Sequence, residues 1–201
     1  TGSFNDEIIA VDVMDKKRNT VTVNIDEEPG RANFDKMDKL RPAFEKNGTV
    51  TAGNASKIND GAAGVLLMSE TKATELGFMP LVRIHSHVSA AQEPEWFTTA
   101  PIKAISKVLK KAGMEVADID LWEINEAFAP VAMAVMDDFN LDHSKVNVNG
   151  GAIALGHPIG ASGARILTTL IYALKSRDVT TGLATLCIGG GEASAMIVER
   201  V

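Results

Sequence analysis

The sequence predicts an α/β fold in which helices cover a β-sheet. From residue 81 onward, β-type runs alternate with amphipathic helical runs at the spacing of a layered α/β domain. Glycine-rich turns follow directly after the runs at 146–149 and 183–188. With 201 residues, of which 45% are hydrophobic, the chain can bury a substantial core in one large domain.

The composition excludes several classes of function. The chain carries 20 basic and 26 acidic residues, a net charge of −6, which gives no reason to expect a nucleic-acid partner. No apolar run reaches membrane-spanning length, and the single cysteine excludes an internal disulfide. The start, TGSFNDEI, resembles no targeting peptide and lacks an initiator Met. We therefore expect a cytoplasmic protein, with organellar targeting left open.

The first 48 residues are rich in charge and poor in core residues. Two β-type runs, 7–13 and 20–25, predict a hairpin, and 35–40 forms at most a short helix ending near Pro42. Basic side chains recur here and at position 57, either as a solvated surface or as phosphate contacts. They are Lys16, Lys17, Arg18, Arg31, Lys36, Lys39, Arg41, Lys46 and Lys57.

Residues 49–68, TVTAGNASKINDGAAGVLLM, form a connector with two distinct parts. Small and turn-forming residues dominate up to Gly61, which is typical of a turn-rich loop. The same small residues would also let an extended ligand lie against backbone amides, and both interpretations stay open. The apolar run that follows, AAGVLLM at 62–68, predicts a buried strand.

The rest of the chain alternates between strands and helices. Helical periodicity places apolar residues on one face of each helical run, as with Leu167, Leu170, Ile171 and Leu174. The final two strands are separated only by Gly189–Glu192, so they should pair antiparallel. The predicted elements are strand 81–88, helix 101–112, strand 119–124, helix 126–139, strand 146–149, helix 162–175, and strands 183–188 and 195–199.

Three positions near strand ends carry groups capable of chemistry. Asn125, in WEINEAF, lies at a strand-to-helix junction, where an N-cap role alone would explain it. His157 lies in the glycine-rich loop 156–163, either as an incidental residue of a tight turn or as an imidazole fixed beside a ligand. Cys187 precedes three glycines, either as a small buried hydrophobe or as a thiol beside free backbone N–H groups. Ligands of α/β sheets bind at strand ends, so their shared placement favours a site.

Four motifs carry a resemblance to a known family. They are TAGNAS at 51–56, NEAF at 125–128, GHPIGASG at 156–163 and CIGGG at 187–191. With these motifs in this order, the chain resembles the C-terminal half of a thiolase, a family of condensing enzymes that act on coenzyme A thioesters. The resemblance implies a layered fold of two similar halves, each with a mixed five-stranded sheet and helices. It places residues 1–58 in the loop region of the first half and 59–201 in the C-terminal domain.

The resemblance also implies roles for the residues at the strand ends. Thiolases attack with a cysteine of the first half, which has no counterpart here, and Cys187 matches the second, acid/base cysteine. His157 would activate the absent thiol, and Cys187 would remove or return the α-proton of the acetyl group. His157 and a water held by Asn125 would stabilise the enolate, and the N–H of Gly189 would stabilise the acyl-enzyme oxyanion.

Other matching positions imply a binding tunnel for the pantetheine arm. Ser56 would contact the arm, and the remaining lining would come from Ala52, Ala127, Phe128 and Phe97. Lys57 departs from the family, which usually has glycine there, and could alter the tunnel or add a phosphate contact. The stretch EPEWF at 93–97 resembles the short-chain members that form acetoacetyl-CoA from two acetyl-CoA. A longer-chain 3-ketoacyl-CoA thiolase stays open.

The expected substrate is a coenzyme A thioester, with no covalently bound cofactor, no metal, no nucleic acid and no membrane. We expect this chain to be inactive without a thiolase N-terminal half, in cis or in trans, and to form a homo-oligomer, a dimer or tetramer. One alternative is a non-catalytic coenzyme A-binding or assembly module, but mere binding needs none of the chemistry of Asn125, His157 and Cys187. Another is a decarboxylating condensing enzyme, but those rely on two histidines, and the cysteine of CIGGG argues against one.

Overall fold

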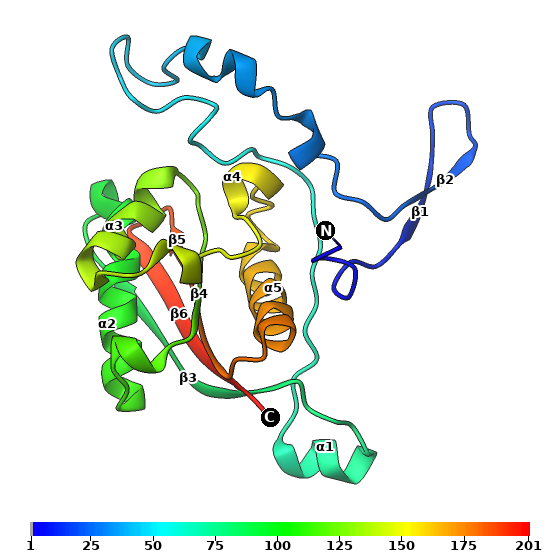
Figure 1. Cartoon of the computed structure of the whole chain (residues 1–201), viewed down its shortest axis with the longest axis vertical. Helices are drawn as coiled ribbons and strands as arrows, with labels where there is room; N and C mark the ends of the chain where they lie inside the picture. Colours follow the sequence, from blue (N-terminus) through cyan, green and yellow to red (C-terminus); the bar gives the residue numbers. More distant parts are fainter. Residues whose placement is uncertain (1) are drawn as a thin grey trace.

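The computed structural model describes residues 2–201, and its centre is a mixed four-stranded sheet (Figure 1). β4 and β5 are parallel, and the other two pairs are antiparallel. The predicted α/β fold is confirmed, as is the antiparallel pairing of the last two strands. The strand order is β3 (Val82–Ala91), β6 (Glu192–Arg200), β5 (Thr181–Ile188) and β4 (Leu121–Ile124).

Helices cover both faces of the sheet (Figure 1). α2 (Ala100–Ala112) and α3 (Ala129–Phe139) pack on one face, with Trp122 and Ile124 of β4 beneath them. α5 (Ser162–Arg177) packs on the opposite face, above Leu121. Successive side chains of a strand point to opposite faces, so β4 is buried along its whole length. The sequence therefore needs apolar residues at nearly every position of this strand.

Most of the short helices fall outside the predicted set. α1 (Glu70–Leu76) has Ser69 as its N-cap, whose side chain accepts a hydrogen bond from the N–H of Lys72. α4 (Ala152–Leu155) lies between Gly151 and Gly156. The 3₁₀ helices are η1 (Pro29–Arg31), η2 (Phe34–Lys39), η3 (Pro94–Thr99), η4 (Val116–Asp118) and η5 (His143–Lys145). Within residues 2–201, no helix has the length and apolar character that crossing a membrane requires.

The N-terminal segment contains the predicted hairpin, which projects from the body (Figure 1). β1 (Val11–Met14) pairs antiparallel with β2 (Thr20–Val23), and every residue of both strands is exposed. A carboxylate oxygen of Asp15 accepts hydrogen bonds from the N–H groups of Lys17 and Asn19, and this closes the turn. η2 confirms the short helix predicted for residues 35–40, as a 3₁₀ helix that ends at Lys39.

The prediction of a buried strand between Gly61 and Met68 is wrong. Residues 61–68 lie outside every strand, and the side chains of Leu66 and Leu67 are 77% and 66% exposed. A strand needs a neighbour that pairs with its backbone groups, and no strand within residues 2–201 pairs with this segment. An apolar run shows that a segment favours burial, but it does not supply the covering element.

The predicted strand at 146–149 is also absent, so neither it nor the segment 61–68 adds a fifth strand to the four-stranded sheet. Val146 forms a single parallel bridge with Trp122. At Asn147 the backbone turns left-handed, with φ of 47°. The carboxamide of Asn147 accepts from the N–H of Ile124 at 2.8 Å and donates to its carbonyl at 2.9 Å. One side chain thus replaces the next strand at the edge of β4.

Candidate functional site

The candidate site lies at the edge of the sheet where β4 and β5 end. Asn125 follows β4 directly, and its backbone N–H donates to the carbonyl of Thr185 at 3.0 Å. Ile124 pairs with Thr185 in the parallel ladder, so Cys187 lies two residues beyond that pair at the same edge. The fold therefore brings Asn125 and Cys187, 62 residues apart in sequence, to one end of two adjacent strands.

Asn125 contacts His157 and does not cap a helix. α3 begins only at Ala129, with Phe128 at the N-cap position, so the N-cap interpretation of Asn125 is wrong. The side chain of Asn125 is 1% exposed, and its Nδ2 lies 3.3 Å from Nε2 of His157. Its Oδ1 is buried without a hydrogen-bond partner among the described residues. A buried acceptor of this kind needs a water or a ligand.

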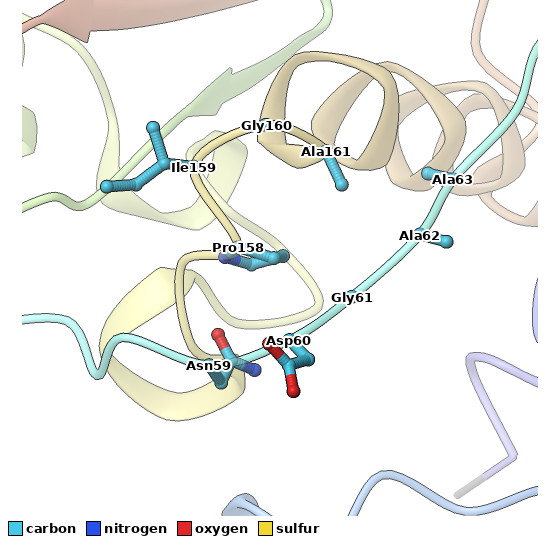
Figure 2. A pocket seen from close by; sticks show the side chains of 9 residues that line it. All are labelled: Asn59, Asp60, Gly61, Ala62, Ala63, Pro158, Ile159, Gly160 and Ala161. Atoms are coloured by element: carbon cyan, nitrogen blue, oxygen red, sulfur yellow. The ribbon is translucent and has the colours of Figure 1, made fainter.

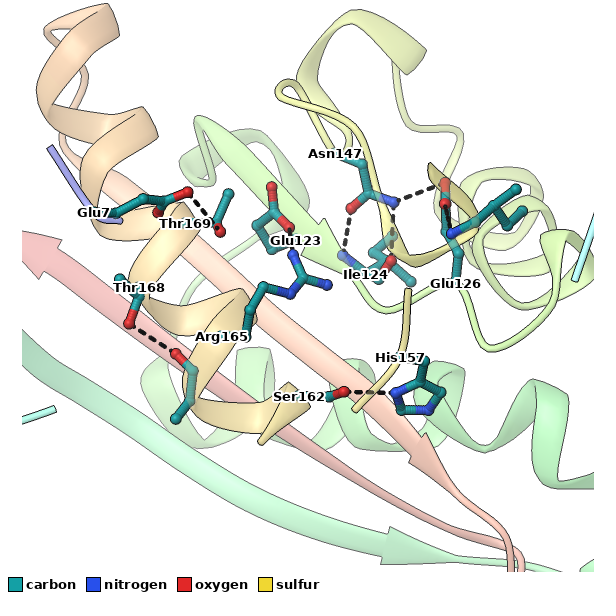
Figure 3. Close-up of polar contacts among 12 residues, drawn as sticks. Glu7, Glu123, Ile124, Glu126, Asn147, His157, Ser162, Arg165, Thr168 and Thr169 are labelled. Atoms are coloured by element: carbon teal, nitrogen blue, oxygen red, sulfur yellow. Dashed lines mark hydrogen bonds and ion pairs between the residues drawn. The ribbon is translucent and has the colours of Figure 1, made fainter. Parts of the chain in front are cut away.

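His157 is half-buried in the loop before α5. Its backbone N–H donates to the carbonyl of Lys57 at 2.8 Å, which joins the loop to the connector. Its Nδ1 lies 2.5 Å from Oγ of Ser162 (Figure 3). Burial lowers the pKa of His157, and the positive charge of Arg165 lowers it further. The imidazole is therefore neutral at pH 7, as a proton acceptor must be.

Cys187 is a buried free thiol. Burial raises the pKa of this thiol, so it holds its proton near neutral pH and can donate it. Gly189 lies in the exposed turn after β5, and a Cβ there would meet open space. Gly191, with φ of 97°, packs against backbone of residues 92–94 so closely that a side chain would clash. The turn after Cys187 is thus held tightly at one end and accessible at the other.

The connector runs beside the NEAF segment. Both the N–H and the hydroxyl of Ser56 donate to the carbonyl of Ala127, at 3.1 and 2.9 Å. Asn54 accepts from the N–H of Thr51 through its Oδ1, so the turn-forming interpretation also holds. Ala52 is exposed in that turn. The fold therefore places Ser56 of the connector in contact with Ala127 of the NEAF segment.

Three aromatic rings meet at Phe128, the residue that follows Ala127. Phe128 packs edge-on against Phe97, with 6.3 Å between ring centroids, and against Phe44, with 6.1 Å. Sequence reasoning missed Phe44. The only signal was an isolated aromatic residue in a charged stretch without periodicity, and its side chain is 73% exposed.

An open groove of about 440 Å³ lies beside the His157 loop (Figure 2). One wall is the connector at 59–63, and the other is the loop at 158–161. Lys57 lies just before the first wall and forms an ion pair with Glu28, at 2.6 Å between Nζ and Oε1. The departure from glycine at position 57 thus links the connector to the N-terminal segment. Its proposed effect on the tunnel or on phosphate stays a prediction.

A buried charged cluster lies behind the site (Figure 3). Glu123 on β4 is 1% exposed, and its Oε2 lies 3.7 Å from Nη1 of Arg165 on α5. Nearby, Glu7 accepts a hydrogen bond from Thr169 at 3.3 Å. Burial raises the pKa of Glu123 to about 8, and the charge of Arg165 offsets only part of that rise. Sequence reasoning missed this cluster, although a lone glutamate in an apolar strand was a signal.

The pKa of Glu123 predicts that stability falls as pH rises. Between the ordinary value of 4.5 and about 8, the folded chain binds one proton more than the unfolded chain at Glu123. The free energy of unfolding should therefore fall with pH, by up to about 1.4 kcal/mol per unit from this group. Glu123→Gln removes this term, so the variant should match the parent near pH 5 and exceed it near pH 8.

Urea unfolding from pH 5 to 8.5 checks this expectation. Glu95→Gln, at an exposed position, is the matched control and should follow the parent throughout. Parallel pH profiles for the Glu123→Gln variant and the parent would contradict a protonated Glu123.

Among residues 2–201, no group of three or more His, Cys, Asp or Glu side chains could hold a metal ion.

Two family models match the chain. Residues 78–200 match the model described as "Thiolase, C-terminal domain", and residues 1–71 match "Thiolase, N-terminal domain".

Curated relatives that are named acetyl-CoA acetyltransferase match the whole of this chain. The chain is 54% identical over 201 residues to an acetyl-CoA acetyltransferase of Allochromatium vinosum, covering 100% of this chain and 51% of that protein. The corresponding Escherichia coli protein is 52% identical over 202 residues, with the same coverage. The chain thus spans about half the length of the curated relatives it matches.

Two solved structures extend the comparison to the fold. The Bacillus anthracis acetyl-CoA acetyltransferase superposes with a TM-score of 0.95 at 45% identity, over 100% of this chain and 51% of that one. Human mitochondrial 3-ketoacyl-CoA thiolase in complex with CoA gives a TM-score of 0.88 at 40% identity, over 100% of this chain and 50% of that one.

Proposed function

Because this chain belongs to the thiolase family, we propose that it is the C-terminal portion of an acetyl-CoA acetyltransferase. The whole enzyme condenses two acetyl-CoA to acetoacetyl-CoA and CoA, and catalyses the reverse thiolysis. One observation carries the proposal: the neutral imidazole of His157 lies 3.3 Å from Asn125, at the edge of the sheet where Cys187 also lies. A binding module would need no such group of proton-transfer residues.

Each of these residues has a distinct chemical role. Nε2 of His157 accepts the proton of the nucleophilic thiol, which belongs to the other half of the enzyme. Cys187 exchanges the α-proton, and its raised pKa suits it to return that proton during thiolysis. The unpartnered Oδ1 of Asn125 holds a water that donates to the developing enolate. The N–H of Gly189 stabilises the oxyanion of the acyl-enzyme step.

The pantetheine arm of the substrate lies along the connector and the aromatic rings. Ser56, Ala52 and Ala127 supply its close contacts, and Phe97 and Phe128 line the tunnel. Phe44 packs on Phe128 and joins the same wall. The bulk of Phe97 favours a short acyl group. A longer-chain 3-ketoacyl-CoA thiolase is the second candidate, since a structure of that name is 40% identical to this chain.

The N-terminal half is the expected partner of this chain. The single cysteine, Cys187, has the acid/base role, so the nucleophile must come from elsewhere. We assign residues 1–58 to the loop region of the first half and 59–201 to the C-terminal domain. Exposed apolar side chains such as Leu66 and Met79, at 77% and 88%, fit a surface that the first half or a second subunit covers. The assembled enzyme is a dimer or tetramer.

Complementation tests this function directly. The chain alone, with its intact mass verified, should show no acetoacetyl-CoA thiolysis. Addition of the N-terminal half of the Escherichia coli acetyl-CoA acetyltransferase should restore activity, because it supplies the nucleophile. The same half with its nucleophilic cysteine replaced by alanine is the matched control and should restore none.

The alternatives give different results. Thiolysis by the chain alone would contradict the assignment of Cys187 as the acid/base group only. If the complemented mixture shows no thiolysis but still binds coenzyme A, the result would favour the non-catalytic binding module. A stable monomer by light scattering, for the chain and for the complemented mixture, would contradict the predicted oligomer.

A further inference from the structure

A line of hydrogen bonds runs from the main chain to Asn125 through His157. The hydroxyl of Ser162 lies 3.0 Å from the carbonyl oxygen of Pro158. Its oxygen lies 2.5 Å from Nδ1 of His157 (Figure 3), and Nε2 of the same ring lies 3.3 Å from Nδ2 of Asn125. The mechanism proposed above uses only the last of these contacts.

The carbonyl of Pro158 determines which atoms donate and which accept in this series of hydrogen bonds. A carbonyl oxygen can only accept, so the hydroxyl proton of Ser162 must lie between the two oxygens. A hydroxyl has one proton, so the oxygen of Ser162 can only accept from Nδ1 of His157. The neutral imidazole has one N–H, which is then at Nδ1, and Nε2 carries a lone pair. Nδ2 of Asn125 donates to that lone pair.

The opposite direction conflicts with two features of the structure. It would point the hydroxyl of Ser162 at Nδ1 and leave two oxygens facing each other at 3.0 Å without a proton. It would also place the proton of the ring on Nε2, so the carboxamide of Asn125 would have to turn over to accept it. Only the first direction satisfies every contact as it stands.

The position of Ser162 is fixed by the backbone around it. Ser162 is completely buried and is the first residue of α5. The carbonyl of Pro158 also accepts from the N–H groups of Ala161 and Ser162, at 2.7 and 2.9 Å. The loop and the helix start therefore hold the hydroxyl in place beside Nδ1 of His157.

We propose that Ser162 is a positioning residue that keeps the proton of His157 on Nδ1, so that the lone pair of Nε2 faces the site. The catalytic meaning of this role rests on the function proposed above, because only an unprotonated Nε2 can accept the proton of the nucleophile. The tautomer itself does not depend on that function.

Nitrogen-15 NMR of the full chain, labelled at histidine, tests the tautomer. At a pH above the imidazole pKa, His157 should show a protonated Nδ1 and an unprotonated Nε2, with its signals identified by their loss in His157→Asn. In Ser162→Ala the buried Nδ1–H loses its acceptor, so the proton should shift toward Nε2. Ser162→Thr keeps the hydroxyl and should keep the parent pattern.

Thr168→Ala is the matched control. Thr168 lies on the same helix, and its hydroxyl donates to the carbonyl of Ala164 at 2.9 Å, again four residues earlier (Figure 3). Its removal should leave the His157 signals unchanged. A parent chain with the proton on Nε2, or an unchanged pattern in Ser162→Ala, would overturn the proposal.

The complemented enzyme provides the second measurement. Ser162→Ala should lower kcat by roughly 10- to 100-fold, the range known for groups that orient metal-ligating histidines, with little change in KM. Ser162→Thr should recover most of that loss. A shifted tautomer with unchanged kcat would overturn the positioning role. If the parent itself stays inactive after complementation, the proposed function fails while the measured tautomer still decides the role of Ser162 in orienting the ring.

Discussion

Cys187→Ala is expected to lower the thiolysis rate of the complemented enzyme by roughly 10²–10⁴-fold, the usual contribution of a general acid or base. The variant removes the only thiol of this chain and leaves the nucleophile of the other half intact. The side chain is buried at the end of β5, and alanine leaves only a small void there. The loss should therefore appear in kcat and not in folding.

Steady-state kinetics with acetoacetyl-CoA, together with a coenzyme A binding measurement, checks this result. Binding should be retained, because the pantetheine contacts lie on Ser56 and the aromatic rings. Ile188→Ala, at the exposed neighbouring position of the same strand, is the control and should remain close to the parent. A rate within tenfold of the parent for Cys187→Ala would remove the proposed acid/base role.

Trp122→Ala is expected to destabilise the chain by about 3–5 kcal/mol, the usual range for a buried aromatic residue. The indole is 1% exposed and stacks on Phe139, with 6.4 Å between ring centroids. It lies in the larger core, between β4 and the helices α2 and α3. A domain of ordinary stability, about 5–15 kcal/mol, would lose a large part of it.

Urea unfolding followed by circular dichroism measures this change. The chain has a second tryptophan, Trp96, which is 59% exposed, so Trp96→Ala is a matched control. That variant should stay within about 0.5 kcal/mol of the parent. Equal effects at the two positions would contradict the placement of Trp122 in the core.

The features that sequence reasoning predicted correctly depend on local patterns. Two β-type runs predicted the hairpin of β1 and β2, and helical periodicity predicted α2, α3 and α5. These patterns repeat every two or 3.6 residues, so a short window contains all the information. The four motifs led to the family that the comparisons later showed.

The errors arose where the outcome depended on residues distant in sequence. The apolar run before Met68 has the composition of a strand, but no strand within residues 2–201 pairs with it. Asn125 has the right type and place for an N-cap, but its side chain instead contacts His157, which lies 32 residues further along the chain. At Asn147 a side chain replaces a strand, because its carboxamide bonds the N–H and the carbonyl of Ile124, 23 residues earlier in the chain.

The sequence by itself determined the α/β class, most of the elements and the residue types that could perform chemistry. Only the tertiary structure decided which of these residues meet. It placed Asn125 beside His157, Ser162 behind the ring, and Phe44 on Phe128. The physical reason is that secondary structure follows from interactions within a few residues, whereas hydrogen-bond direction and pKa depend on burial and on partners that the whole fold brings together.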